Sequence, residues 1–457
     1  MHGSEAPSAF LAAWDACAAR AQAPLCAAAA LAARRSWFDT LATTAAGAVE
    51  NCARAALRAS AVDEVRALSA GDAALVLGAA SHALDYDDVC MLATCHPSAP
   101  PTAALLALLP QLARERPGLT LGELLAAYLV GTETMLRLGA WLGFRHYALG
   151  FHATGTLGTV GSAAAAAHAL GLPTAQAHVA LSIAASSACG LRANFGTDTK
   201  PLHVGLAASA GVRAALLAHA GADASDDVWG PTGFALAFNG GELPQALPWR
   251  DGTAWAIVEP GFEHKRYLSC YLTHRLISGL LQLRGRRDAA VLGQPVRIEI
   301  EVAHQGLAAL KHPQATTGLQ GKFSGHYCAA AAWLDGRVDL ASFSDAAVQR
   351  AALQAQMRHV VLRERAAAGE SLDKAPVRVA LHGTGWSDEV VVDWAPGSLA
   401  DPMTRPQLER KWHDCAAHGG MALSPAQGSA LLDAPLDTPA VALLAPLRDA
   451  LLMAVAR

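Results

Sequence analysis

The chain of 457 residues is poor in charge, since only 16% of its residues are Asp, Glu, Lys or Arg while 53% are apolar. Typical soluble domains carry roughly 25% charged residues, so most helices in this sequence have little polar surface and must be buried. The apolar content is too high for a disordered chain. The shortage of charge therefore predicts a large core and large interfaces between subunits.

The sequence also lacks runs of basic residues, and its formal net charge is −4. Nucleic acid is excluded as a partner because phosphates are neutralised by clustered cations. The apolar stretches are too short or too polar for a membrane span of about 20 residues. The segment Met1–Pro24 has neither the basic start nor the cleavage site of a secretory signal. We therefore expect a cytoplasmic protein that does not bind membranes.

Motifs that hold metals or nucleotides are missing as well. The nine cysteines form no CxxC pair and no Cys/His spacing typical of zinc or iron–sulfur ligation. No GxGxxG follows a strand, and neither GxxxxGK[ST] nor GxSxG occurs. Dinucleotide-binding, P-loop and serine-hydrolase functions are excluded on this basis.

The sequence predicts mainly helices. Nine helices are predicted before residue 221, at Ala6–Ala21, Leu25–Ala46, Asn51–Arg58, Ala70–Asp85, Thr102–Arg114, Leu121–Trp141, Gly155–Leu170, Ala175–Ser187 and Leu202–Ala220. Gly, Pro and Asp separate them, as the ends of helices require.

The pattern changes after about residue 290. Apolar residues alternate with polar ones over Val296–Val302, which is the period of a half-buried strand. Val377–Leu381 and Glu389–Val392 flank a turn and predict a hairpin, while Phe323–Leu334 and Ser344–Val360 read as helices. The predicted fold is mainly α. A large all-helical domain, split into residues 1–265 and 396–457, receives an inserted α+β domain over residues 266–395.

Three segments place a titratable or basic residue directly before a predicted helix, namely His96, His152 and Lys200. Proline is favoured at the first helical position, so Pro97 and Pro201 predict two of these helix starts. The free N–H groups and the dipole of a helix N-terminus bind anions. The sequence therefore predicts an anionic ligand, and a carboxylate fits.

Asp85, Asp87 and Asp88 follow a predicted apolar helix, where the dipole disfavours carboxylates. We expect Asp85 to have a specific partner among the basic residues above, and Asp87 and Asp88 to cap or pair structurally. Cys270 and His274 would share a face of a helix. A thiol nucleophile pair is one interpretation of them, and a buried inert cysteine is the other.

A cluster of His, Lys and Asp suits proton abstraction next to a carboxylate. Cations and N–H dipoles neutralise the developing enolate while a His or Lys takes the proton. The substituent on the next carbon then decides between dehydration, decarboxylation and return of the proton to the other face.

Motifs spread over most of the chain resemble the MmgE/PrpD family, which includes 2-methylcitrate dehydratase, cis-aconitate decarboxylase and iminodisuccinate epimerase. They are Ser81–Val89 with His96–Ser98, Gly150–His152 with Gly155–Gly158, Asn194–Gly205, Lys265–Tyr267 with Ser269, Cys270 and His274, and Lys322–Ser324 with Tyr327 and Cys328. The resemblance implies a homodimer in which a smaller α+β lid covers a helical domain, with the active site in the cleft. It also implies that no metal and no organic cofactor is needed.

By motif position, the resemblance puts the family's functional residues on Asp85, His96, His152, Lys200, Lys265 and Tyr327. We assign catalytic roles to His96, His152, Lys200, Asp85 and Cys270, and substrate-binding roles to Lys265, Tyr327, His274 and Lys322. In this scheme His96 and His152 transfer the proton, and Tyr327 and Cys270 close the pocket from the lid.

Two departures from the family pattern and one spacing indicate which branch of the family this chain resembles. Val89 stands where the decarboxylase has Thr, Cys270 stands where it has His, and the Asp85 to His96 spacing is similar to that of the epimerase. The resemblance thus implies an epimerase or isomerase acting on a small di- or tricarboxylate. The first alternative is a hydro-lyase of the 2-methylcitrate dehydratase type. The alternative of another class is a non-catalytic, carboxylate-binding dimeric paralogue.

Overall fold

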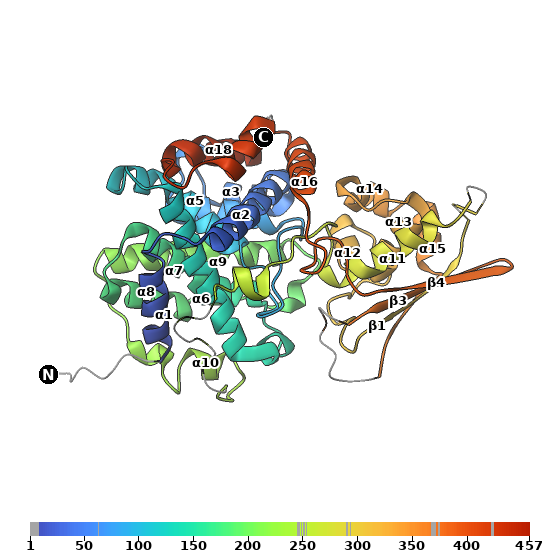
Figure 1. Cartoon of the computed structure of the whole chain (residues 1–457), viewed down its shortest axis with the longest axis horizontal. Coiled ribbons are helices and arrows are strands. Elements are labelled where there is room, and N and C mark those ends of the chain that lie inside the picture. The colour runs from blue at the N-terminus through green and yellow to red at the C-terminus, as the bar shows by residue number, and fades with distance from the viewer. Residues whose placement is uncertain are drawn as a thin grey trace.

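The computed structural model describes residues 9–62, 64–244, 247, 249, 252, 254–288, 291–292, 294–366, 372, 375–421 and 425–457. Residues 1–8 lie outside these ranges; they include the first three residues of the predicted helix Ala6–Ala21 and the start of the segment Met1–Pro24, for which no secretory signal is expected. The described residues form a larger helical part and a smaller α+β part, which lie side by side in Figure 1. The predicted mainly α fold is confirmed, and the exact domain boundaries stay a prediction.

The helical part contains both ends of the described chain. Its helices are α1 (Ala9–Arg20), α2 (Ala27–Gly47), α3 (Asn51–Ala59), α4 (Ala70–His82), α5 (Ala99–Glu115), α6 (Leu121–Ala148), α7 (Ala153–Leu170), α8 (Thr174–Ser186), α9 (Thr199–His219), α10 (Phe234–Ala237), α16 (Arg405–His418), α17 (Pro425–Asp433) and α18 (Ala440–Val455). Each of the nine predicted helices corresponds to one of α1–α9. The C-terminal helices return to this part, where α16 packs against α2 and α18 against α5.

Small residues let the central helices α4 and α9 approach closely. A Cβ atom at Gly78 of α4 would lie 2.7 Å from the Cα atom of Gly205 of α9, so neither position has room for a larger side chain. The C-terminal end of α4 leads to Asp85, and the first turn of α9 carries Lys200. This close packing therefore sets the distance between two of the predicted site residues.

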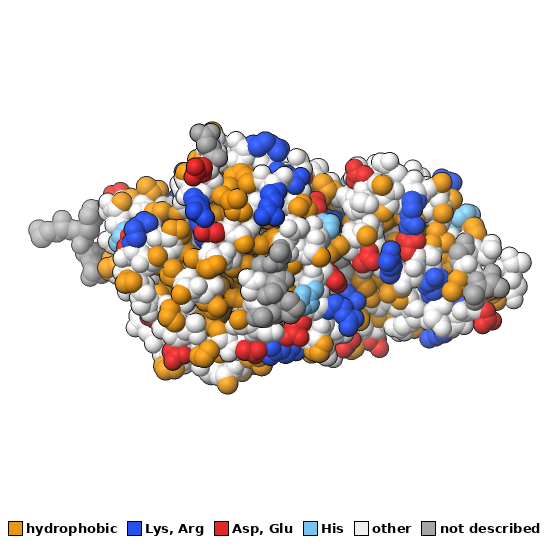
Figure 2. Space-filling view, turned by 90° about the horizontal axis from the view of Figure 1, so that it is seen from above, with side chains coloured by type: hydrophobic (Ala, Val, Ile, Leu, Met, Phe, Trp, Pro, Cys, Tyr) orange, Lys and Arg blue, Asp and Glu red, His pale blue; other side chains and the backbone are white. Residues whose placement is uncertain are grey.

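The length and composition of α9 would let it cross a membrane, but 67% of its apolar window is buried inside the protein. That degree of burial fits a core helix. On the face of the molecule shown in Figure 2, hydrophobic side chains cover much of the helical part and charged ones are sparse, in line with the low charge content.

The smaller part is a four-stranded sheet with helices packed against it (Figure 1). Its elements are α11 (His274–Gly285), β1 (Arg297–Val302), α12 (Gly318–Lys322), α13 (Gly325–Asp335), α14 (Asp345–Val348), α15 (Ala351–Met357), β2 (Val360–Glu364), β3 (Val377–Gly383) and β4 (Trp386–Val392). The strand order is β2-β1-β3-β4, and β1 pairs parallel with β2 and antiparallel with β3. The predicted first strand and the β3–β4 hairpin are confirmed. Gly385, with φ of 79°, provides the left-handed turn of the hairpin.

The helix predicted over Ser344–Val360 is wrong as a continuous element. It is divided into α14 and α15, and Val360 begins the strand β2. Val360 pairs with Ile298 of β1, about sixty residues earlier. Because this pairing is parallel and distant in sequence, no local pattern indicates it.

Two predicted helix starts are also corrected. α5 begins at Ala99, with Pro100 and Pro101 in its first turn, so Pro97 lies before the helix. α9 begins at Thr199, which places Lys200 and Pro201 inside its first turn. His152 does directly precede α7.

Candidate active site

The turn that follows α4 gives each of its three carboxylates a different partner. Asp85 has a left-handed backbone, with φ of 52°, a conformation that Asp tolerates better than most residues. The carboxylate of Asp85 contacts two lysines, that of Asp87 contacts two histidines, and that of Asp88 accepts hydrogen bonds from Ser98. The expectations of a specific partner for Asp85 and structural pairing for Asp87 and Asp88 are confirmed.

Asp85 joins two lysines from distant segments. Lys200 Nζ lies 2.5 Å from Asp85 Oδ1, and Lys265 Nζ lies 3.0 Å from Asp85 Oδ2. Lys265 also donates to the backbone carbonyl of Asp85, at 2.7 Å. Burial by itself would raise the pKa of Asp85, but Lys200, Lys265 and His96 together hold it well below its usual range. Asp85 is therefore an ionised carboxylate that fixes both ammonium groups.

Short backbone pairing brings Lys265 to this position. Val89 and Glu263 exchange two backbone hydrogen bonds of 2.9 Å, so the chain after Asp85 runs beside the chain before Lys265. Behind them, Lys411 of α16 donates to the carbonyls of Tyr86 and Lys265 at 2.8 and 3.0 Å. The charge of Lys411 is balanced by buried Asp39, with 2.7 Å between Nζ and Oδ1.

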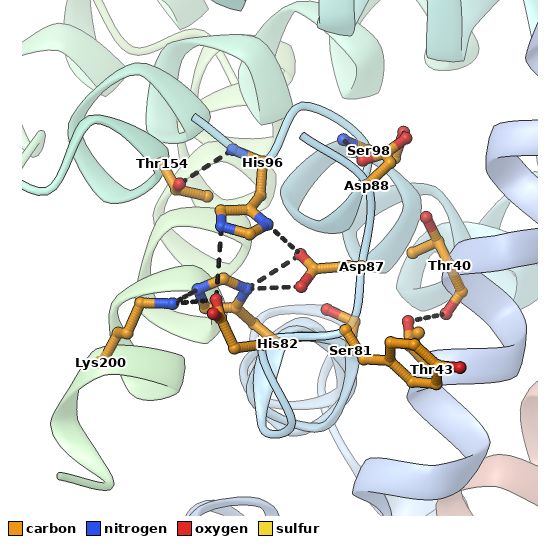
Figure 3. Close-up of polar contacts among 12 residues, drawn as sticks. Thr40, Thr43, Ser81, His82, Asp87, Asp88, His96, Ser98, Thr154 and Lys200 are labelled. Carbon is orange, nitrogen blue, oxygen red and sulfur yellow. Dashed lines mark hydrogen bonds and ion pairs between the residues drawn. The ribbon is translucent and has the colours of Figure 1, made fainter. Parts of the chain in front are cut away.

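Asp87 lies between two histidines (Figure 3). His82 Nδ1 is 2.9 Å from both carboxylate oxygens, and His96 Nδ1 is 3.3 Å from Oδ2. Burial lowers the pKa of His82 to about 3, although Asp87 opposes the shift. Neutral His82 thus donates from Nδ1 to Asp87 and accepts through Nε2 from Lys200, at 2.8 Å. His82 is not among the predicted site residues, because a histidine within an apolar helix is usually a packing residue.

His96 and His152 lie on the same pocket but have different neighbours. His96 is placed between two carboxylates, with Nε2 3.4 Å from Asp85 Oδ1, and its backbone N–H donates to Thr154 Oγ1. His152 Nδ1 lies 3.0 Å from His203 Nδ1. Burial and then the charge of Lys200 hold the pKa of His152 well below its usual value, so this imidazole is neutral.

These side chains line a pocket of about 680 Å³, including its opening to solvent, with contributions from both parts of the protein. Six of the predicted site residues line it: Asp85, His96, His152, Lys200, Lys265 and Cys270. Sequence reasoning missed the aromatic and aliphatic lining, for which the sequence has no signal beyond apolarity. These missed residues include Phe144, Tyr147, Phe195, Leu272 and Phe323.

Three predicted binding residues are not among the described lining residues. The hydroxyl of Tyr327 is buried and donates to the carbonyl of Ser342, so Tyr327 does not close the pocket. Lys322 Nζ donates to the carbonyl of Ala83 at 3.2 Å. His274 Nε2 is 3.4 Å from the carbonyl of Ser269. All three lie in motifs near the pocket, but motif position does not decide which way a side chain points.

The geometry does not favour a thiol nucleophile. Cys270 precedes α11, which begins at His274, so the two residues do not share a helix face as predicted. Burial raises the pKa of Cys270 to about 11 and lowers that of His274 to about 3. A neutral thiol beside a weakly basic imidazole is a poor nucleophile.

Four of the residues offer ligand atoms within 4.8 Å of one another, which would suit a metal ion: His82, Asp85, Asp87 and His96. However, the two oxygens of Asp85 already face ammonium groups, and both oxygens of Asp87 face His82. A cation placed there would meet two positive charges at close range. The donor set therefore fits an internally paired charge cluster better than a metal centre.

The fold and the pocket together define a two-part protein. It is mainly helical, and its smaller α+β part contributes residues to a charged pocket on the helical part. The chain belongs to the MmgE/PrpD family. It matches the MmgE/PrpD N-terminal domain over residues 14–246 and the MmgE/PrpD C-terminal domain over residues 267–430.

Two curated relatives are cis-aconitate decarboxylases. The human protein is 32% identical over 290 residues, which are 61% of this chain and 58% of that protein. The mouse protein is 29% identical over 362 residues, which are 74% of this chain and 70% of that protein. The chain thus matches less than two thirds of the length of the human relative.

Proposed function

We propose that this protein is a lyase that moves a proton at a carbon next to a carboxylate, without a cofactor. The observation that carries the proposal is the pair of lysines held by Asp85 in one pocket with two histidines. The names of the two relatives, both decarboxylases, support a lyase reaction.

The substrate carboxylate binds at Lys200 and Lys265, near the N-terminal ends of α7 and α9. These positive groups stabilise the enolate that forms when the neighbouring carbon loses a proton. Neutral His152 has a lone pair for that proton. Asp85 remains ionised and touches no reacting atom, so it is a positioning residue for both lysines.

Two outcomes are compatible with this arrangement. In a dehydration, the carbon–hydrogen bond breaks as His152 takes the proton, and the carbon–oxygen bond breaks as His96 protonates the departing hydroxide to give water. In a decarboxylation, the carbon–carbon bond breaks, carbon dioxide leaves, and a histidine protonates the resulting carbanion. Each outcome uses the same enolate stabilisation.

The proposed lyase reaction differs from the expectation based on the motifs, which ranked an epimerase first and a lyase second. The two relatives favour the lyase, while the departures at Val89 and Cys270 and the Asp85 to His96 spacing favour the epimerase. Both readings share the removal of a proton beside a carboxylate, so one experiment separates them.

The experiment is incubation in deuterated water with cis-aconitate, 2-methylcitrate and iminodisuccinate, followed by NMR and mass spectrometry. We expect one of two results: loss of carbon dioxide with deuterium at the carbon that a histidine reprotonates, or loss of water with deuterium only in the recovered substrate. Deuterium exchange without loss of either would establish an epimerase. Absence of exchange and of any product with all the carboxylates tested would favour a non-catalytic paralogue.

His152→Ala and Lys200→Ala should each lower turnover by about 100-fold or more while the circular dichroism spectrum is retained. Near wild-type activity in either variant would refute the assigned roles.

We also propose that the protein is a cytoplasmic homodimer. Twelve large hydrophobic side chains are exposed on the described surface, among them Leu31, Leu206, Leu217 and Met453, and a shared interface would cover such side chains. Sedimentation equilibrium gives the mass directly, and a monomer at micromolar concentration would contradict the proposal.

A further inference from the structure

The pocket has two chemically different walls. One wall is polar and carries Asp85 of the turn after α4, His96, His152 before α7, Lys200 of α9, and Lys265, which lies in the segment before α11. The other wall is apolar, and we define it by five lining residues: Phe195, Cys270, Leu272, Ala309 and Phe323.

The apolar wall is separate from the main core. Its members pack together as a small cluster of their own, with the rings of Phe195 and Phe323 5.6 Å apart. Leu272 is half-buried and lies on the pocket side of this cluster. Lys200 marks the boundary of the two walls, since its Nζ lies 5.2 Å from the ring of Phe195 and 5.1 Å from that of Phe323.

The positive charges of the pocket lie on the polar wall. Lys200 and Lys265 contribute two, of which Asp85 cancels one, and His96 is the proton donor of the proposed function. The ends of α7 and α9 each add a partial positive charge of about half a unit. None of the five residues that define the apolar wall is charged, so a carboxylate placed against them has no cation among those residues.

A carboxylate pressed against the apolar wall would lose its hydration without gaining a partner, which is unfavourable. An alkyl or aryl group there would instead leave water and contact Phe195, Leu272 and Phe323. We therefore infer that the substrate carries an apolar substituent opposite its reacting carboxylate. The inference rests on the proposed function, because that function puts the carboxylate at the lysines.

Binding to substituted succinates tests the inference directly. Isothermal titration calorimetry compares succinate, methylsuccinate, propylsuccinate and benzylsuccinate with tricarballylate, in which a carboxymethyl group replaces an alkyl group of similar size. Affinity should rise about fourfold for each methylene that becomes buried. Propylsuccinate should bind at least tenfold more tightly than tricarballylate. Equal affinities for all the alkyl succinates, or tighter binding of tricarballylate than of propylsuccinate, would overturn the inference.

Variants of the apolar wall test whether these residues bind the alkyl group. Leu272→Asn should weaken the binding of propylsuccinate about tenfold or more and leave that of succinate within twofold. The matched control is Val391→Asn, which is 54% accessible on strand β4 of the smaller part, whereas the side chains named for the dimer interface lie on helices of the larger part. It should change neither affinity. If Leu272→Asn does not fold, Phe323→Leu should shift the preferred substituent towards larger groups. An unchanged preference in a folded variant would refute the role of this wall.

Turnover of the carboxylates named in the first experiment keeps the two proposals apart. Tight binding of propylsuccinate by a protein that neither converts cis-aconitate, 2-methylcitrate or iminodisuccinate nor exchanges their protons would refute the proposed function and leave the shape of the pocket as inferred. Conversion of one of them, with equal affinities across the alkyl series, would refute the inference alone.

Discussion

Replacing Asp85 by Asn tests whether one carboxylate holds the two active-site lysines. Asn has nearly the same shape but no charge, so the ammonium groups now 2.5 and 3.0 Å from the carboxylate oxygens would lose their counter-charge. All three side chains are at least 95% buried. Removing one partner of a buried ion pair costs about 3–5 kcal/mol. Two lysines share this partner, so we expect a loss towards the upper end of that range.

The assay is urea unfolding at neutral pH, followed by circular dichroism, with the free energy of the first transition as the readout. The matched control is Asp72→Asn. Asp72 pairs with Arg213 at the surface, at 3.2 Å, where such a pair is worth about 1 kcal/mol or less. A loss no larger than that of Asp72→Asn would refute the reasoning.

Three further predictions concern the same region. Lys200→Met should lower kcat by about 10²–10³-fold, as removal of a group that stabilises an oxyanion does, and an unchanged rate on the true substrate would contradict this. Lys411→Met should lower kcat more than it raises KM, because Lys411 holds the backbone carbonyls of Tyr86 and Lys265 without lining the pocket. Lys411→Arg should restore part of the rate, and equal changes in both variants would argue for a merely structural role. Burial lowers the pKa to about 3 in His82, His264 and His274. These residues bind protons in the unfolded state below about pH 6.5 but stay neutral in the folded one. The free energy of unfolding should therefore be constant above that pH and fall by roughly 1–2 kcal/mol per histidine at about pH 5, and a flat urea-unfolding profile between these values would contradict it.

The sequence predicted secondary structure well where the signal is local. The nine N-terminal helices and the β3–β4 hairpin follow from periodicity and from turn residues. β2 was missed because its five residues become a strand by pairing with β1, and parallel pairing depends on contacts far along the chain.

The candidate site also combines residues that the sequence indicates with contacts that only the folded chain shows. Scarcity of charge made Asp85, Lys200 and Lys265 conspicuous, and the unfavourable position of Asp85 after a helix indicated a cationic partner. The motifs also predicted Tyr327, Lys322 and His274 as binding residues. Only the folded chain shows that they point to backbone carbonyls outside the described lining.

What the sequence alone determined is therefore the helical architecture and the charged residues available for chemistry. The tertiary structure decided that Asp85 holds two lysines at once and that an apolar wall lines the same pocket. The physical reason is that composition and periodicity act within a few residues. Ion pairs and pocket walls depend on the close approach of segments that are more than a hundred residues apart, such as α4 and α9.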